Sequence, residues 1–217
     1  MKAVVFDQFG PPEVLKIRDA PDPIAGAGEV LVRVRACSVN RTLDLETREK
    51  GAGFGVTLPH ISGADPCGEV VAVGAGVTSP HVGQRVAVSP MLTCGACPMC
   101  RRGTENACLN LKILGVHRHG GYAELVRAPA GNALPLPDGL SYEEAACLPL
   151  SYAVAWHLLV VLARVALGDV VLISTHDDWA ALKGYQVHPA HVEVARVIAA
   201  LRIERRVLDF EIASDAR

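Results

Sequence analysis

The sequence predicts a mainly β protein with some α-helix. We expect a small partial β-barrel that carries a cysteine-rich lobe and is followed by a short α/β tail. The barrel is predicted by short β-branched runs that recur about every 8–12 residues between turns rich in Gly and Pro. Half of the 217 residues are hydrophobic, which is enough to bury a sizeable core. The lobe is predicted by four of the seven cysteines, which fall close together in the chain.

Five short segments of the first half are predicted to be strands of the barrel. In the run 31–36, arginines alternate with valines, and strict alternation is typical of a strand with one buried face. The polar residues 40–50 predict a short helix with a loop. The predicted strands are residues 2–6, 14–17, 29–36, 68–74 and 84–88.

Four cysteines, Cys94, Cys97, Cys100 and Cys108, form the pattern C-x2-C-x2-C-x7-C. Thiolates are soft ligands, and Zn²⁺ accepts four of them in a closed tetrahedron. Because four sulfurs leave no position for water or substrate, the spacing predicts a structural zinc site rather than a catalytic one. Two disulfides, or reduced cysteines without metal, are the alternatives. We favour zinc because the composition indicates a cytosolic protein, and disulfides are rare in that compartment.

A helix is predicted to begin after Ser141, because Ser141 and Glu144 have the spacing of a capping box. We expect this helix to run to about Ala166, with a break at Pro149. Gly168 should end it, and the apolar run 169–173 should form a further strand.

The charge balance and the apolar stretches bear on partners and location. Net charge is −2, so neither nucleic acid nor a membrane surface is indicated as a partner. The longest apolar stretch, 153–167, contains His157 and Arg164 and is shorter than the roughly 20 residues of a spanning helix. No signal sequence is visible, because Asp7 follows directly on the first apolar residues. The sequence therefore predicts a cytoplasmic protein.

Several motifs resemble the medium-chain dehydrogenase/reductase family, which includes the zinc alcohol dehydrogenases and the quinone oxidoreductases. The resemblance covers about residues 1–173. It implies a GroES-like substrate domain at 1–140 with a structural zinc lobe at 91–112, then a connecting helix and the first strand of a Rossmann-like unit at 141–173. It also implies NAD(P)H as the hydride donor and a small-molecule carbonyl or quinone substrate. The motifs are the cysteine lobe and residues 63–71, 82–86, 120–124 and 136–140.

The sequence departs from the zinc alcohol dehydrogenases at their catalytic metal. In those enzymes Cys, His and Cys hold a zinc, and the resemblance aligns these positions with Asn40, Ala64 and Leu150. An amide, a methyl and an isobutyl group cannot make a transition-metal site, so we expect no catalytic metal. This pattern resembles the quinone oxidoreductases, in which Asn40 would lie near the nicotinamide as a catalytic residue. The alternative is that Asn40 is a turn residue that bonds its own backbone.

A second departure follows the strand 169–173. The family continues there with a glycine-rich turn whose backbone amides bind the pyrophosphate of the cofactor. Here the turn carries Thr175, His176, Asp177 and Asp178. Two carboxylates at this point repel a diphosphate. The sequence therefore predicts no complete Rossmann domain, and NAD(P)H binding that is very weak or absent.

The tail resembles the second half of the stress-responsive A/B barrel family, a dimeric ferredoxin-like fold. The resemblance covers residues 168–212 and implies an A/B-barrel-like tail at 174–217 that pairs two chains as a homo-dimer. In a plant polyketide cyclase of that family, residues at the positions of Tyr185 and His191 act as the acid and base. The alternative is that His188 and His191 serve helix entry and dimer packing.

Three functional hypotheses follow. The first is a zinc-binding oxidoreductase whose ancestor transferred hydride from NAD(P)H to a carbonyl or quinone, and which is impaired here by loss of the nucleotide-binding domain. The second is a non-enzymatic, zinc-stabilised scaffold that dimerises. The third is cyclase-type chemistry through Tyr185 and His191.

Overall fold

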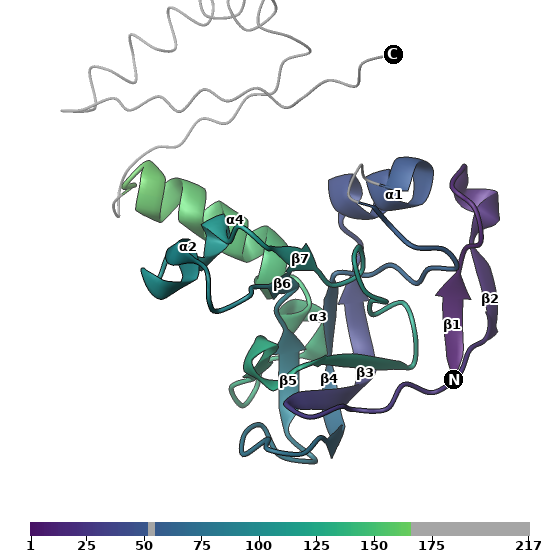
Figure 1. Cartoon of the computed structure of the whole chain (residues 1–217), viewed down its shortest axis with the longest axis horizontal. Coiled ribbons are helices and arrows are strands. Elements are labelled where there is room, and N and C mark those ends of the chain that lie inside the picture. Colours follow the sequence, from purple (N-terminus) through teal and green to yellow (C-terminus); the bar gives the residue numbers. More distant parts are fainter. Residues whose placement is uncertain (52–54, 166–217) are drawn as a thin grey trace, which may run out of the picture. The chain divides into compact units, whose positions relative to one another are not determined.

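The computed structural model describes residues 1–51 and 55–165, which are drawn in colour in Figure 1. The chain divides into two compact units, Met1–Ala153 and Val154–Arg217. All strands of the described residues belong to the first unit.

A five-stranded antiparallel sheet forms the centre of the first unit, in the order β8-β3-β4-β5-β9. Figure 1 shows β3, β4 and β5 side by side. The strands belong to the mainly β, curled sheet that the spacing of apolar runs predicts. Their bounds are β3 Glu29–Ser38, β4 Asp65–Val73, β5 Arg85–Val88, β8 Leu125–Pro129 and β9 Ala133–Pro135.

Alternation along the strands builds the main core. On β3, Val30 and Val32 are fully buried, whereas Arg33 and Arg35 are exposed. Burying one such valine stabilises the fold by roughly 1.5–3 kcal/mol relative to leaving it in water. The same pattern on the neighbouring strands adds the other buried members of this core, which are Val70, Val86, Val88, Leu92, Leu114, Val126, Ala128 and Ala133.

Strands β3 and β4 approach each other closely at Gly68. A β-carbon on Gly68 would lie 1.9 Å from the carbonyl oxygen of Arg33, so a side chain there would have to push the strands apart. The pairing shifts register nearby, at Leu31/Val32 and at Val34/Ala36. Such irregularities bend a strand and increase its twist. Glycine at position 68 therefore permits the close approach of β3 and β4.

A separate two-stranded sheet contains the N-terminus. The amide of Val4 donates to the carbonyl oxygen of Tyr122 at 2.8 Å, which attaches this sheet to the loop before β8. Ala3, Val5 and Ile61 form a small core of their own. The elements are β1 Lys2–Val5, the 3-10 turn η1 Pro12–Val14 and β2 Lys16–Asp19.

The cysteine lobe leaves the central sheet between two very short strands. Strand β6 pairs with β7 through Met91 with Ile113 and Leu92 with Lys112. Because the root is only two residue pairs wide, most of the lobe must be held by contacts of its own. Its elements are β6 Met91–Leu92, α2 Pro98–Arg101, the 3-10 turn η3 Glu105–Ala107 and β7 Lys112–Ile113.

Helix α1 (Arg41–Lys50) confirms the short helix predicted for residues 40–50. Asn40 caps its N-terminus, and Gly51 ends it in the left-handed conformation with a φ of 70°. Its buried side carries polar residues, Asp44, Thr47 and Arg48. An ordinary surface helix buries an apolar stripe, so this polar face marks α1 as a place to look for function.

The capping box at Ser141 is confirmed, but the expected break at Pro149 is a change of helix type. Glu144 N donates to Ser141 Oγ at 3.2 Å, and Ser141 N donates to Glu144 Oε2 at 3.1 Å. Proline lacks an N–H, and Tyr152 N bonds instead to the carbonyl of Cys147, five residues back. The helical segment then continues to Leu162. Its parts are α3 Tyr142–Ala145, the π-helical η5 Leu148–Tyr152, α4 Ala153–Trp156 and the π-helical η6 His157–Leu162.

This helical segment, Tyr142–Leu162, has 21 residues and by length and composition could cross a membrane. The apolar stretch identified in the sequence, 153–167, is shorter than this segment. The first turn, however, is anchored in the first unit, where Ala145 and Ala146 are buried with Cys67 and Ala87. A span beginning after these alanines would be shorter than the roughly 20 residues that a bilayer needs. The first turn is therefore part of the domain, whereas only 11% of the most apolar window of the segment is buried.

Candidate functional site

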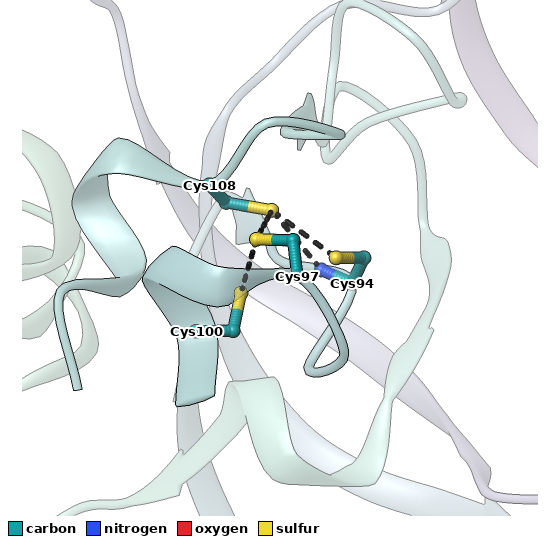
Figure 2. A group of neighbouring side chains, drawn as sticks. All are labelled: Cys94, Cys97, Cys100 and Cys108. Carbon is teal, nitrogen blue, oxygen red and sulfur yellow. Dashed lines mark hydrogen bonds between the residues drawn. The ribbon is translucent and has the colours of Figure 1, made fainter. Parts of the chain in front are cut away.

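The four lobe cysteines converge on one point, as Figure 2 shows. Their sulfur atoms all lie within 4.8 Å of one another. Cys97 Sγ is 3.5 Å from Cys100 Sγ and 4.0 Å from Cys108 Sγ, and Cys108 Sγ is 3.5 Å from Cys94 Sγ. Four sulfurs at Zn–S distances of about 2.3 Å in a tetrahedron are about 3.8 Å apart. The donor set and its spacing therefore fit zinc.

The disulfide alternative does not describe this cluster. All seven cysteines are free thiols, and sulfurs at 3.5 Å are far from the roughly 2.05 Å of a disulfide bond. Three of the four are buried and Cys94 is exposed. The metal would thus be enclosed on three sides by the lobe.

Backbone and amide donors around the sulfurs favour the thiolate forms of Cys94 and Cys97. The N–H groups of Ala96 and Cys97, with the amide of Asn110, lower the pKa of Cys94 to about 6. Backbone N–H groups, that of Cys100 foremost, also lower the pKa of Cys97. Burial raises the pKa of Cys100 to about 12. A bound cation would favour the thiolate there.

Asn40 lies at the start of α1 with its side chain engaged in the cap. Asn40 Oδ1 accepts a hydrogen bond from Leu43 N at 3.2 Å. This is the alternative that the sequence left open, in which Asn40 bonds its own backbone. Asn40 Nδ2, by contrast, makes no hydrogen bond to any residue in the described ranges 1–51 and 55–165. The side chain can therefore cap the helix and still donate to a ligand.

The carboxylate of Asp44 holds the backbone of Asn40 by a hydrogen bond. Its Oδ2 accepts from Asn40 N at 2.7 Å and from the Tyr122 hydroxyl at 2.6 Å. The same hydroxyl lies 3.2 Å from the carbonyl oxygen of Ser38. Burial raises the pKa of Asp44, and the bond from Tyr122 lowers it. Tyr122, Asp44 and Asn40 thus form one connected polar cluster.

A second carboxyl, Asp65, lies at the start of β4. It is completely buried, and its Oδ2 accepts from Ser38 Oγ at 2.8 Å. Its Oδ1 has no hydrogen-bond partner among the described residues. Burial raises the pKa of Asp65 to about 6, Ser38 lowers it and the charge of Asp44 raises it further. Sequence reasoning quoted Asp65 only as part of a motif. The available signal was a carboxylate at the beginning of a run of apolar and small residues.

The other two positions aligned with catalytic-zinc ligands carry hydrocarbon side chains. Ala64 is buried directly before β4. Leu150 lies in η5, a segment that packs against β4. Neither side chain can coordinate a metal.

The other predicted site residues, Tyr185 and His191, lie outside the described residues. So do the turn from Thr175 to Asp178 and His188.

Comparisons with known proteins give two matches to family models. Residues 26–138 match the alcohol dehydrogenase GroES-like domain. Residues 165–212 match the stress responsive A/B barrel domain. The two matched segments do not overlap.

Individual relatives are dehydrogenases. An alcohol dehydrogenase of Geobacillus stearothermophilus is 40% identical over 147 residues, which is 67% of this chain and 43% of that protein. L-galactonate-5-dehydrogenase of Escherichia coli K12 is 33% identical over 162 residues, 75% of this chain and 46% of that protein. This chain therefore spans less than half the length of these relatives.

Two of the solved structures that this chain resembles are also alcohol dehydrogenases. A crystal structure of an NAD-dependent alcohol dehydrogenase is similar with a TM-score of 0.76 and 40% identity, covering 91% of this chain and 55% of that one. A cobalt- and zinc-bound thermostable alcohol dehydrogenase from Pyrobaculum aerophilum is similar with a TM-score of 0.69 and 35% identity, covering 74% and 48%.

Proposed function

Because the chain belongs to the medium-chain dehydrogenase/reductases, through its alcohol dehydrogenase GroES-like domain, we propose that it is the substrate-binding part of a reductase without a catalytic metal. The reaction would be NAD(P)H-dependent hydride transfer to a carbonyl or quinone. A structural zinc would be held by Cys94, Cys97, Cys100 and Cys108. We further propose residues 1–140, 141–173 and 174–217 as its substrate domain, connecting segment and tail, and a cytoplasmic location.

One contrast carries this proposal. The four lobe sulfurs lie at distances that suit a tetrahedral metal, while Asn40, Ala64 and Leu150 offer no thiolate or imidazole where the metal-dependent relatives have one. A chain that keeps the structural metal site without the catalytic ligands needs another way to polarise its substrate. Asn40 Nδ2, which has no partner among residues 1–51 and 55–165, can donate to a substrate oxygen.

The cofactor would supply the hydride, and this chain's own residues would orient the substrate and manage the proton. Asn40 is held for that task by its cap bond to Leu43 and by Asp44. The surface around Asn40 suits the nicotinamide end of a dinucleotide. The acidic residues of the segment 175–178 in the sequence predict weak affinity for the pyrophosphate.

The deciding experiment is a titration of the 217-residue chain with NADPH and NADH, by fluorescence and by calorimetry. Saturable cofactor binding, even with a weak dissociation constant, together with turnover of a quinone or enone, would support the reductase. A dissociation constant in the low micromolar range would show that the prediction of weak affinity is wrong. Asn40→Ala should then raise KM and lower kcat, whereas Asn106→Ala, at an exposed asparagine of the cysteine lobe, should leave both unchanged. No detectable binding at millimolar cofactor would contradict the proposal.

A second candidate function is a zinc-stabilised scaffold that dimerises. The helical segment Tyr142–Leu162 exposes several large apolar side chains, and exposed apolar patches commonly mark interfaces. Light scattering at micromolar concentration tests this function independently of the cofactor. Trp156→Glu should yield monomers, and Leu134→Glu, at an exposed apolar residue on β9, should not. The exposed residues are Tyr152, Val154, Trp156, Val160, Val161 and Leu162.

A further inference from the structure

Two carboxyl groups, Asp44 and Asp65, are buried near the start of α1, and they differ in the number of hydrogen bonds that they accept. Asp44 receives hydrogen bonds from Tyr122 and from the backbone of Asn40. Asp65 receives one, from Ser38, and its Oδ1 has no partner among the described residues. An isolated charge in such a place is strongly disfavoured, and the group neutralises instead.

The surroundings of Asp65 offer no positive charge to hold an ionised carboxylate. Across residues 1–51 and 55–165, no ion pair reaches Asp44 or Asp65. The titratable groups that face Asp65 are Cys37 on β3, Asp44 on α1, Cys67 on β4 and Tyr122 in the loop before β8. Burial raises the pKa of both cysteines and of Tyr122, so these groups stay uncharged.

The position of Ser38 connects Asp65 to the face that carries Asn40. Ser38 and Asp65 are register partners at the end of β3 and the start of β4. Ser38 is half-buried, whereas Asp65 is fully enclosed. Asn40 follows Ser38 by two residues and begins α1. The Ser38 hydroxyl thus bonds the buried carboxyl from a half-buried position, two residues along the chain from Asn40.

We propose that Ser38 and Asp65 form an acid site that delivers the proton required when a carbonyl or quinone is reduced. This inference rests on the proposed reductase function. Ser38 would touch the substrate, and Asp65 would act through it as the positioning and proton-holding group.

The proton balance is simple. Hydride from a reduced nicotinamide adds to the substrate, whose C=O π pair moves to oxygen as a negative charge. The Ser38 hydroxyl, which donates to Asp65 Oδ2 in the structure, must first turn toward the substrate. The substrate oxygen then takes the proton of this hydroxyl, and Ser38 Oγ takes the proton of Asp65. Asp65 is left as a carboxylate, and water reprotonates it after the product leaves. One hydride and one proton are consumed for each carbonyl reduced.

The pKa of Asp65, about 6, supports this use, because an efficient acid has a pKa near the working pH. Tyr122 is a poorer candidate. Its hydroxyl already donates to Asp44, and burial raises its pKa.

The first test follows the proton itself and needs no turnover. Difference infrared titration of the full chain should detect a protonated carboxyl that ionises with a midpoint near pH 6. Asp65→Asn should remove this band, and Asp19→Asn, at an exposed carboxylate of β2, should keep it. Ser38→Ala should raise the midpoint, because the carboxylate loses its donor. A wild-type chain without such a band at pH 5 would overturn the acid site.

The second test measures the reduction of a quinone or enone by NADPH. Asp65→Asn should lower kcat by at least about 100-fold, the lower end of the roughly 100- to 10,000-fold that positioned proton transfer contributes, with KM nearly unchanged. The decline of the wild-type rate above pH 6 should vanish in this variant, and Asp65→Glu should restore part of it. An unchanged kcat and pH profile in Asp65→Asn would overturn the proposal.

The two tests separate the inference from the proposed function. If the wild-type chain turns over no substrate, the reductase and this catalytic use of the acid are both wrong, whatever the infrared result. If turnover occurs without the infrared band, the reductase stands and the Ser38–Asp65 acid site is wrong.

Discussion

Gly68 of β4 and Arg33 of β3 are so close that a β-carbon on Gly68 would lie 1.9 Å from the Arg33 carbonyl oxygen. Gly68→Ala should therefore lower the free energy of unfolding by about 3 kcal/mol or more, since overpacking against backbone cannot relax by a rotamer change. Gly131→Ala is the matched control, because a β-carbon there meets nothing within 4 Å. Urea denaturation of both variants measures the difference. Equal stabilities would contradict the close approach of β3 and β4.

The lobe should bind one zinc per chain. Metal analysis of untagged protein from zinc-replete medium should find about one equivalent. Cys97→Ser should reduce this sharply, because Cys97 Sγ lies within 4.0 Å of two other cluster sulfurs. Cys147→Ser, at an exposed cysteine outside the lobe, should leave it unchanged. Less than about a tenth of an equivalent in the wild type would show that the cluster is not a zinc site.

No second, catalytic zinc should be present. The positions where ligands would be needed hold Asn40, Ala64 and Leu150, which cannot bind a transition metal. A chain in which all four lobe cysteines are serine should therefore contain no tightly bound zinc after dialysis. Zinc that survives these substitutions would reveal ligands that are not recognised here.

The capping box at Ser141 should be worth about 1 kcal/mol. Ser141→Ala removes the Ser141 hydroxyl, which accepts from Glu144 N and donates to Glu144 Oε2, and the loss of an N-cap serine typically costs about that much. Ser151→Ala, at an exposed helical serine, removes no cap and should cost less. Thermal denaturation followed by circular dichroism compares the two. A larger loss in Ser151→Ala would contradict the assigned helix start.

Asp65 should make stability depend on pH in a defined direction. Its pKa is about 6 in the folded chain and about 3.9 when unfolded, so folding favours the protonated form. Its contribution is complete below about pH 4 and is lost as the pH rises through 6. The stability of Asp65→Asn minus that of the wild type should rise by about 2–3 kcal/mol between pH 4 and pH 7.5. Asp44 and His60 titrate in both proteins, so their effects largely cancel. A flat difference would mean that Asp65 titrates normally.

Local patterns in the sequence predicted much of this structure. The alternation along β3, the capping box at Ser141 and the cysteine spacing are each set within a few residues, so they can be read without knowledge of the fold. The π-helical turn after Pro149 could not be read in this way. Whether a proline ends a helix or widens it depends on the packing of the following turns, here of η5 against β4 and β5.

The burial of Asp65 could not be predicted from the sequence either. Its burial arises from the register of β4 against β3, which brings Ser38 beside it from 27 residues away in the chain. Asn40 shows the opposite case, because its cap bond to Leu43 is local. The sequence suggested that bond as one of two alternatives, and the structure has it while leaving the amide nitrogen available.

The narrow root of the cysteine lobe has a consequence for how the protein responds to metal supply. Among the described residues, strands β6 and β7 pair with each other through only two residue pairs, so holding the segment between them closed costs chain entropy that a bound metal would offset. When zinc is scarce, this segment should open as a local unit while the five-stranded sheet stays folded. Amide hydrogen exchange would then quicken between residues 93 and 111 alone, and the exposed thiols would become targets for oxidation and proteolysis before any global unfolding occurred.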